Sequence, residues 1–523
     1  MNLICQYPDA NRQPGLVASD DFWIELMGPL LPGLQLELPQ TDSGAGSPDS
    51  SCHSSGIAGS PLSSSSSSVP PRHDRASDLS LRSDGAQTLA PTEYDLFQHY
   101  LEHTSKDLTV NDDDQYTLQV GIPNLACESK PLMRSVLALA AVCKCRDIIS
   151  QPSISHQDRG QVLELLSLAH GYHMESLREI QATLHETKHY EHVLANAAMM
   201  GMYGSGSYCT RIWLVKTATL GDQPLADVHT PKHSEWISLF RAARLAYAGL
   251  LDNDTPTTDD MSQSYPARSP VDPIQMQYGY KVSSRAELPR APSQHPLSSI
   301  LAATVGSALV RLNERAREIA VIVQGNNELN SDLQVCFTAL SMFSNIATET
   351  FSSADDARPD TPGHVHSHSR LAFEVDMVNT VGHGRLSQIP PWLRRYTASI
   401  TSMTPSNLPR RTVMSFIHKV PTGYLNLLED MISLLHTDPS EEMVPEPSLA
   451  HQLALEIFAH WLVLVILLDN VWWIGGIGAW ELGRIVAFRK RVGWDMCLEA
   501  RDESWWPESM FEISRQFDKH RIE

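Results

Sequence analysis

Residues 131–149 read PLMRSVLALAAVCKCRDII, and this stretch decides the fold class. Pro131 suits the first turn of a helix, where no N–H group is needed. Apolar residues recur at helical spacing on two faces: Leu132, Val136, Leu139 and Cys143 on one, and Met133, Leu137 and Ala140 on the other. A helix that is apolar on two faces belongs in the centre of a fold. We therefore expect a helical protein built around this segment.

The rest of the chain extends the helical pattern in both directions. The stretch 158–184 carries one long apolar stripe that includes His173, which we expect to be a hydrogen-bonded core histidine. Other helices are predicted at 92–108, 192–203, 210–220, 235–251, 298–324, 332–351, 423–437, 448–473, 477–494 and 507–519. We find no convincing run of alternating β-branched residues and no repeat of fixed period, so the predicted fold class is all-α.

The composition divides the chain into three parts. Residues 1–30 are a short mixed segment, and residues 31–90 are rich in serine and proline, with six consecutive serines at 63–68. Such a segment buries too little apolar surface to offset its ordering entropy, so we predict a disordered linker. Residues 91–523 form the predicted all-α domain. Loops rich in Pro, Ser and Asp interrupt this domain at about 252–298 and 352–369.

Charge and cysteine usage restrict the class of protein. The formal net charge is −21, which does not suit a protein that binds nucleic acid with its bulk surface. The eight cysteines are scattered, and no signal peptide precedes residue 30, so a reducing compartment is expected.

The most apolar stretch is 457–468, IFAHWLVLVILL. A membrane-spanning helix needs about 20 apolar residues. Extending this stretch to that length would place Asp469 near the middle of the span, at a cost of roughly 3 kcal/mol. We therefore predict a helix buried in a protein core and no contact with a membrane.

Several groups of residues in the sequence contain possible metal ligands. His364, His366 and His368 alternate in a Pro/Asp/Ser-rich loop without a partner ligand, which favours a solvated loop. Cys143-Lys-Cys145 is too close for a zinc chelate, and the two thiols would point apart on a helix. Asp112-Asp113-Asp114, in a predicted acidic loop, is typical of magnesium–diphosphate sites. The second metal-binding motif that such enzymes need was not found.

The glycine-rich and basic stretches were assigned structural roles. GMYGSGS at 201–207 and GGIGAW at 475–480 match no phosphate-binding fingerprint, so their glycines are expected at helix ends or at close helix contacts. The basic groups Arg394-Arg395, Arg410-Arg411 and Arg489-Lys490-Arg491 are expected on solvated faces. No catalytic residues and no cofactor-binding residues are predicted, and the chain is not expected to be an enzyme.

Four stretches resemble the fungal-specific transcription factor domain of fungal zinc-cluster regulators. Near the C-terminus these are LLDNVWWIGGIG at 467–478 and ESWWPESMFEISRQF at 503–517. Near the start of the helical part they are YDLFQHYLEHTSKDL at 94–108 and IPNLACESKPLMRSVLALAAVCKC at 122–145. The resemblance covers roughly residues 92–521, and the motifs are more specific together than singly.

The resemblance also gives a meaning to Cys5-Gln-Tyr-Pro. Regulators of this family begin with a six-cysteine cluster that holds two zinc ions, and Cys5 is similar to the last of these cysteines. The other five ligands would precede Met1, so zinc is expected only in a longer parent. The family implies a nuclear regulator of RNA polymerase II transcription. It contacts DNA only through that cluster, acts as a homo- or heterodimer, and responds to co-regulators and a small-molecule effector.

Two alternatives remain open at this point. The chain can be a stand-alone helical module for protein interaction or dimerisation that does not bind DNA. It can also be an all-α lyase that acts on diphosphates with magnesium at Asp112–Asp114.

Overall fold

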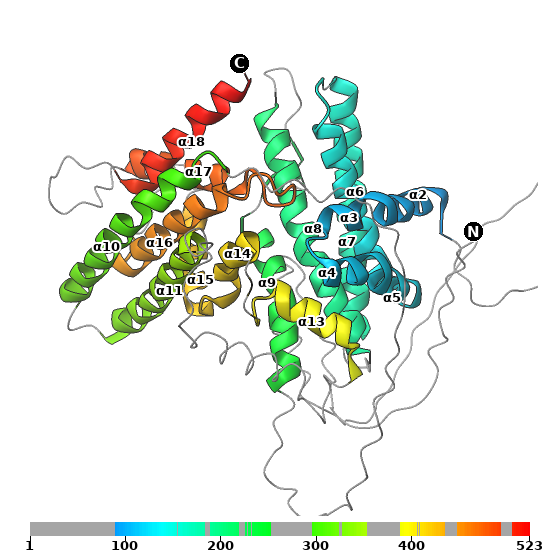
Figure 1. The fold of residues 1–523 in the computed structure, drawn as a ribbon, viewed down its shortest axis with the longest axis horizontal. Helices are drawn as coiled ribbons and strands as arrows, with labels where there is room; N and C mark the ends of the chain where they lie inside the picture. Colours follow the sequence, from blue (N-terminus) through cyan, green and yellow to red (C-terminus); the bar gives the residue numbers. More distant parts are fainter. Residues whose placement is uncertain are drawn as a thin grey trace, which may run out of the picture.

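The computed structural model describes residues 89–153, 155–183, 189–218, 225–226, 229–231, 233–252, 295–323, 327–352, 388–404, 406, 408–434, 447–492 and 505–522. Nearly all of these residues are helical and none lies in a strand, which confirms the predicted all-α class (Figure 1). The predicted disordered linker at 31–90 and the segment 1–30 lie outside the described residues, apart from Leu89 and Ala90. Most of the two predicted loops also lies outside them.

The first group of helices runs from residue 91 to residue 252. It consists of α2 (Pro91–His99), the π-helical segment η2 (Tyr100–Thr104), α3 (Ser105–Leu108), α4 (Asp112–Tyr116), the π-helical segment η3 (Thr117–Gly121), α5 (Ile122–Glu128), α6 (Lys130–Ile149), α7 (His156–Thr183), α8 (Tyr190–Lys216) and α9 (His233–Asp252). We call these elements the N-terminal half.

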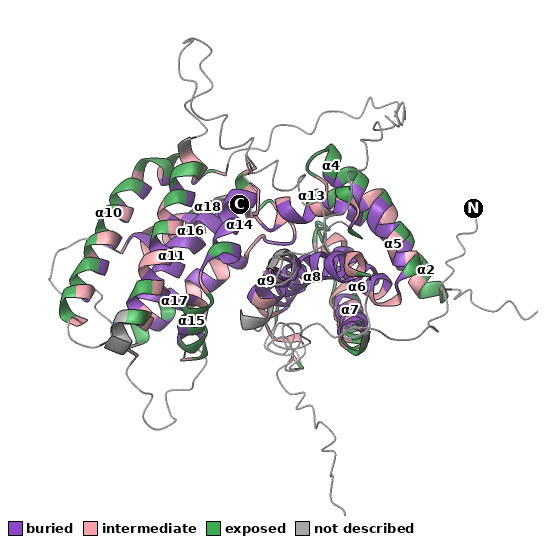
Figure 2. Ribbon diagram, turned by 90° about the horizontal axis from the view of Figure 1, so that it is seen from below, coloured by how far each residue is buried: buried purple, intermediate pink, exposed green. Residues whose placement is uncertain are grey.

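The second group of helices runs from residue 298 to residue 522. It consists of α10 (Ser298–Val323), α11 (Asn327–Ser352), α13 (Pro391–Ile400), α14 (Pro409–Lys419), α15 (Thr422–Leu434), α16 (Leu449–Ile466), α17 (Ile477–Val492) and α18 (Trp506–Ile522). We call these elements the C-terminal half. The two halves lie side by side, with α9, α13 and α14 between their outer helices (Figures 1 and 2).

Helix α6 is the central helix of the N-terminal half, as its two apolar faces predict. It packs against α7 and α8, and both of its apolar stripes are fully buried. Pro131 lies in its first turn, and Cys143 and Cys145 are buried, as expected. The helix therefore has apolar neighbours on both sides and no solvated face along most of its length.

Helix α8 corrects one prediction, because the segment 192–203 and residues 210–216 of the segment 210–220 belong to a single continuous helix, which ends at Lys216. The glycines between them lie inside this helix rather than at its ends. A side chain at Gly204 would come within 2.9 Å of Leu239 on α9, and one at Gly206 within 3.1 Å of Trp472. These glycines thus mark close contacts, which is the other role expected for them.

Helix α16 is the core helix of the C-terminal half. Among the described residues it is the one helix long and apolar enough to span a membrane, but 83% of it is buried inside the fold. It packs against α11, α15, α17 and α18. The burial agrees with the predicted core helix.

The end of α16 differs from the prediction, because the helix stops at Ile466 and residues 467–476 form a series of turns. The carboxylate of Asp469 accepts a hydrogen bond from the N–H of Gly476 at 2.9 Å and so closes the turn. Gly476 has φ +84°, a conformation that favours glycine. Gly478 then lets α17 lie directly against the backbone of α16, since a Cβ there would lie 2.8 Å from the N of Ile466.

Aromatic side chains join the two halves. Trp236 of α9 stacks on Trp461 of α16 with ring centroids 6.5 Å apart and an angle of 12° between the rings. Tyr208 of α8 stacks on the other side of this pair, against Trp236, and Phe416 of α14 stacks against Trp461. The Trp461 indole N–H donates to the carbonyl of Val413, at 2.9 Å. The interface between the halves is thus a packed aromatic core.

Candidate functional site

A cavity of about 50 Å³ lies where the two halves meet. The helices α3, α8, α9, α13 and α14 and the turn after α16 all contribute to its wall. Its lining residues are Leu108, Ala198, Gly201, Met202, Phe240, Ala243, Tyr396, Ile400, Arg410, Arg411, Met414, His418 and Trp473. The wall is therefore mostly apolar, with the cations and the histidine all supplied by α14.

The sequence of α14 places these polar groups together. Pro409 occupies the first turn, where its missing N–H costs nothing. Residues 410, 414 and 418 follow at intervals of four, so Arg410, Met414 and His418 lie on one face of the helix. That face is turned toward the cavity.

Arg411 is held by a buried carboxylate from the N-terminal half. Its Nη2 lies 2.7 Å from both carboxylate oxygens of Asp114, and its Nη1 donates to the hydroxyl of Ser399. Arg411 is 8% exposed and Asp114 is 2% exposed. A carboxylate at this depth is stable as an ion only with such a partner.

Three further arginines near Arg411 donate to carbonyls at the C-terminal ends of helices. Arg410 donates to Leu108 at the end of α3 (3.0 Å), Arg244 to Thr401 after α13 (2.9 Å), and Arg241 to Val420 after α14 (3.3 Å). The C-terminus of a helix carries roughly half a negative charge, so each contact is favourable. Each contact compensates only part of one positive charge.

The cluster of Arg241, Arg244, Arg410 and Arg411 therefore carries excess positive charge. Within the described residues, Asp114 is the only carboxylate that forms an ion pair with any of the four. Burial, and then the neighbouring Arg244, lower the pKa of Arg241 to about 10. Burial, followed by Arg411, also lowers the pKa of Arg410. We call these four residues the arginine cluster.

His418 is a buried titratable group of this site. It is 3% exposed, and neither ring nitrogen makes a hydrogen bond of standard geometry. Burial lowers its pKa to about 3, with further lowering from Arg244 and Arg241 and a smaller opposing effect from a hydrogen bond of non-standard geometry with the backbone of Ile400. The imidazole is neutral at pH 7, so it offers one N–H donor and one acceptor.

Aromatic rings form the wall beside these groups. The His418 ring stacks on Phe240 with centroids 4.7 Å apart, and Phe240 stacks on Trp473 at 6.0 Å. The guanidinium of Arg410 lies 5.9 Å from the centroid of the Trp473 ring. The site thus combines a flat apolar wall with several donors.

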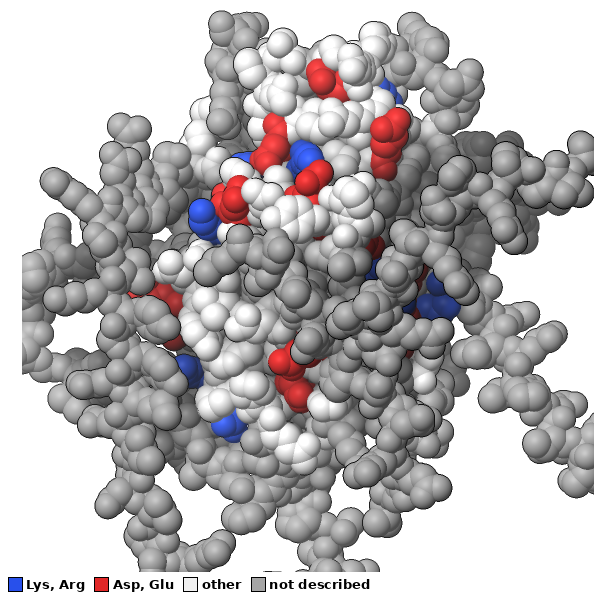
Figure 3. All heavy atoms as spheres, turned by 90° about the vertical axis from the view of Figure 1, so that its right-hand side faces the viewer, with Lys and Arg blue, Asp and Glu red and all other residues white. Residues whose placement is uncertain are grey.

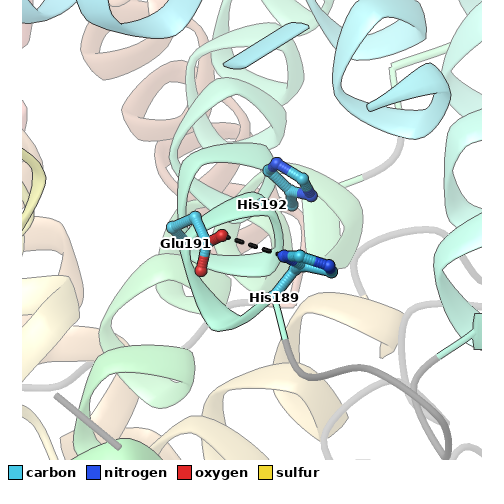
Figure 4. A group of neighbouring side chains, drawn as sticks. All are labelled: His189, Glu191 and His192. Carbon is cyan, nitrogen blue, oxygen red and sulfur yellow. Dashed lines mark hydrogen bonds and ion pairs between the residues drawn. The ribbon is translucent and has the colours of Figure 1, made fainter. Parts of the chain in front are cut away.

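A second group of possible ligands lies at the start of α8, where His189, Glu191 and His192 are close together (Figure 4). The Nδ1 of His189 lies 3.1 Å from a carboxylate oxygen of Glu191, and the two imidazole rings stack with centroids 5.1 Å apart. Their potential metal-binding atoms lie within 4.8 Å of one another. Ligands of a tetrahedral zinc ion lie roughly 3.3 Å apart, so this group would have to contract to bind zinc.

The comparisons with known proteins bear on the N-terminal half. A family model covers this part of the chain. Residues 95–245 match the fungal specific transcription factor domain. The match begins inside α2 and ends inside α9, so it includes the two opening motifs at 94–108 (apart from Tyr94) and 122–145. It ends before the C-terminal motifs. Searches of the curated proteins and of the solved structures gave no significant match.

The structure corrects the predicted loop conformation of the acidic motif Asp112–Asp114, which lies within the segment that matches the fungal specific transcription factor domain. Residues 112–116 form helix α4 rather than a loop, with Asn111 capping the N–H of Asp114 at 2.8 Å. Asp112 and Asp113 are exposed, whereas Asp114 points inward to Arg411. Two carboxylates of the motif therefore face solvent, and the third is buried in the core. This division does not support a magnesium–diphosphate site.

The structure does not test the predicted zinc ligand Cys5 or the histidines of the predicted solvated loop. Cys5, His364, His366 and His368 lie outside the described residues. His173, inside the matched domain, is 2% exposed and stacks on Tyr203 with ring centroids 4.4 Å apart, as expected of a core histidine. Its Nδ1 has no hydrogen-bond partner, so the expected hydrogen bonding is not found at that atom.

The largest correction concerns the predicted exposure of the basic residues. Arg411 is buried and Arg410 is half-buried, although the sequence pattern indicated a solvated face. Arg489 is also half-buried and pairs with Glu508 at 3.4 Å, whereas Arg395, Lys490 and Arg491 are exposed as predicted. Pro409, directly before Arg410-Arg411, is the sequence feature that predicts a helix start here. A helix would have given these two side chains different faces, rather than a shared exposed loop.

Proposed function

We propose that this chain is the regulatory part of a fungal transcription regulator that controls transcription by RNA polymerase II in the nucleus. The observation that carries the proposal is the match of residues 95–245 to the fungal specific transcription factor domain. The matched family is a transcription factor domain rather than a class of enzymes. The all-α fold agrees with a regulatory role.

In this proposal, the contact with DNA is made by a separate basic module. The net charge of −21 opposes binding of phosphate by the bulk surface. On the face drawn in Figure 3, acidic and basic side chains of the described residues are interspersed and form no continuous basic surface. Cys5 would be one ligand of a zinc cluster in that module. Dimer partners and co-regulators would bind the helical part.

A reporter experiment tests the regulatory role without the upstream module. The full chain is fused to an unrelated DNA-binding domain, and a reporter gene with the matching binding sites is measured in a fungal cell. We expect transcription to rise or fall relative to the DNA-binding domain alone at equal nuclear abundance. A fusion that occupies the sites and leaves transcription unchanged would contradict the proposal.

A matched variant separates regulation from mere presence of the fusion. Asp114→Asn leaves an unpaired charge in the core and should reduce the regulatory effect in proportion to the loss of folded protein. Arg395→Gln, which changes an exposed arginine of α13, should leave it intact. An effect that survives unfolding of the helical part would assign regulation to another segment.

A further inference from the structure

We propose that the cavity between the two halves binds a small organic oxyanion, a carboxylate or phosphate that carries an apolar group. The anionic end would lie against Arg410 and His418, and the apolar group against the aromatic wall. That such a ligand acts as an effector of transcription rests on the proposed function, whereas the binding itself does not.

The charge balance supports an anion. The arginine cluster contains four cations and its ion pairs among the described residues involve one carboxylate, that of Asp114. The three contacts to helix C-termini each involve a partial charge only. Buried cations are stable when they are paired, and an oxyanion in the cavity supplies the missing negative charge. Guanidinium groups match the planar geometry of carboxylate and phosphate oxygens.

His418 supports a ligand that accepts a hydrogen bond. Its side chain lines the cavity and is only 3% exposed. Both of its ring nitrogens lack a hydrogen-bond partner of standard geometry. Unpartnered buried donors are rare, because each forfeits its hydrogen bond to water. A neutral imidazole N–H that donates to an oxyanion would remove this deficit without a change of protonation.

The size of the cavity supports a small anionic group. A volume of about 50 Å³ holds a few water-sized groups, at roughly 10–15 Å³ each, which is comparable with a carboxylate or phosphate group. The lining supports an apolar neighbour of that group, because the rings of Phe240 and Trp473 and the side chain of Met202 form part of the wall. An apolar chain exceeds the present volume, so it would displace side chains of this wall as it leaves water.

The binding can be measured directly on the purified full chain. Hexanoate, hexyl phosphate, inorganic phosphate and the neutral control hexanol are each titrated by calorimetry and by thermal unfolding. We expect hexanoate or hexyl phosphate to raise the melting temperature, and hexanol to have no effect. The two organic anions distinguish a carboxylate site from a phosphate site. Failure of both to bind, or equal binding of hexanol, would overturn the inference.

Inorganic phosphate tests the apolar part of the inference. It lacks the hexyl group, so we expect weaker binding than for hexyl phosphate. Equal binding of the two would overturn the role of the aromatic wall.

Two variants locate the site. Arg410→Gln keeps a donor but removes the charge, and it is expected to weaken binding of the organic anion about tenfold, the effect of losing one charge-assisted hydrogen bond. His418→Phe keeps the ring stacked on Phe240 but removes both nitrogens, and should also weaken binding. Arg395→Gln, on the exposed side of α13, is the matched control and should bind as the wild type does.

The outcomes separate this inference from the proposed function. Unchanged binding in both Arg410→Gln and His418→Phe would place the anion elsewhere and overturn the site. If one variant fails to fold, the other variant and the comparison of hexanoate with hexanol on the wild type still decide. If an organic anion binds the purified chain but the fusion leaves reporter transcription unchanged, the result supports the binding site and contradicts the regulatory role.

Discussion

Two clusters of basic residues differ in how their charges are balanced. In the arginine cluster at α9 and α14, four buried or half-buried cations have one carboxylate partner among the described residues, Asp114. At α17 and α18, Glu508 pairs with Arg489 at 3.4 Å and with Lys490 at 2.7 Å, and the pair with Lys490 is open to solvent.

The difference shows that a basic sequence pattern does not fix its environment. RR at 410–411 and RKR at 489–491 look alike in the sequence. The first begins a short helix enclosed between two halves of the protein, whereas the second ends a helix at the surface. Ion pairs in these two settings differ several-fold in the free energy lost when one partner is removed.

The largest effect is expected from breaking the buried pair. Asp114→Asn leaves Arg411 without a counter-charge beside three other arginines, which should lower the free energy of unfolding by about 3–5 kcal/mol. Urea unfolding followed by circular dichroism measures this loss. The double change Asp114→Leu with Arg411→Met removes both charges and should cost less than Asp114→Asn alone. A loss below 1 kcal/mol for Asp114→Asn would show that the pair is hydrated.

Glu456 gives a pH test near the second cluster. Burial raises its pKa to about 7, and Arg315 and Arg489 oppose this shift. Between pH 4.5 and 7 the unfolded chain releases a proton that the native protein keeps, so stability falls as the pH rises. Glu456→Gln removes this fall and should be more stable than the wild type at pH 8, by up to about 3 kcal/mol.

The matching control for Glu456→Gln is the same measurement at pH 4. The wild-type side chain is then neutral in the folded protein and mostly neutral in the unfolded chain, so we expect the two stabilities to agree to within a few tenths of a kcal/mol. A variant that is less stable than the wild type at pH 8 would show that the carboxylate is ionised and paired.

His418 gives the opposite pH dependence in the arginine cluster. Its native pKa of about 3 lies below the ordinary value of 6.5. As the pH falls below 6.5 the unfolded chain takes up a proton that the native protein does not, so stability is lost down to about pH 3. His418→Phe should remove a loss of about 2 kcal/mol at pH 5. An unchanged pH profile in His418→Phe would contradict the assignment.

The smallest effect is expected from the basic cluster at α17 and α18, which is open to solvent. Glu508→Gln breaks the pairs with Lys490 and with Arg489, whose side chain also lies over the ring of Trp505 at 4.7 Å. Because all three charges keep contact with water, the loss should be about 1 kcal/mol or less, and smaller in high salt. The measurement is urea unfolding at two salt concentrations. A loss as large as that of Asp114→Asn would remove the distinction between the two clusters.

The parts of the fold that could be predicted are those with long periodic patterns. Helices α6, α7 and α16 bury their apolar residues over four or more turns, and their presence follows from the sequence pattern, although α16 ends at Ile466 rather than at 473. Helices α13 and α14 were missed, because 10 and 11 residues give too few repeats of the pattern. Each also begins at a proline, a signal that is shared by turns and helix starts.

The candidate site could not be predicted from the sequence, because its parts are far apart in it. Asp114 and Arg411 are separated by 297 residues, and Arg410 reaches Leu108 across 302 residues. A cluster of this kind exists only once the two halves are packed together. The buried state of Cys143 and of His173 was predictable, since each lies on the apolar face of a long helix.

The stacked aromatic rings have a consequence for spectroscopy. Trp236 and Trp461 come from different halves, and their indoles lie nearly parallel with centroids 6.5 Å apart. Transition dipoles at this distance couple, so the pair should produce a near-ultraviolet circular dichroism signal that neither ring gives alone. Because the coupling falls steeply with distance, separation of the two halves would extinguish it while the helices themselves remain. Near-ultraviolet circular dichroism therefore reports whether the two halves are in contact.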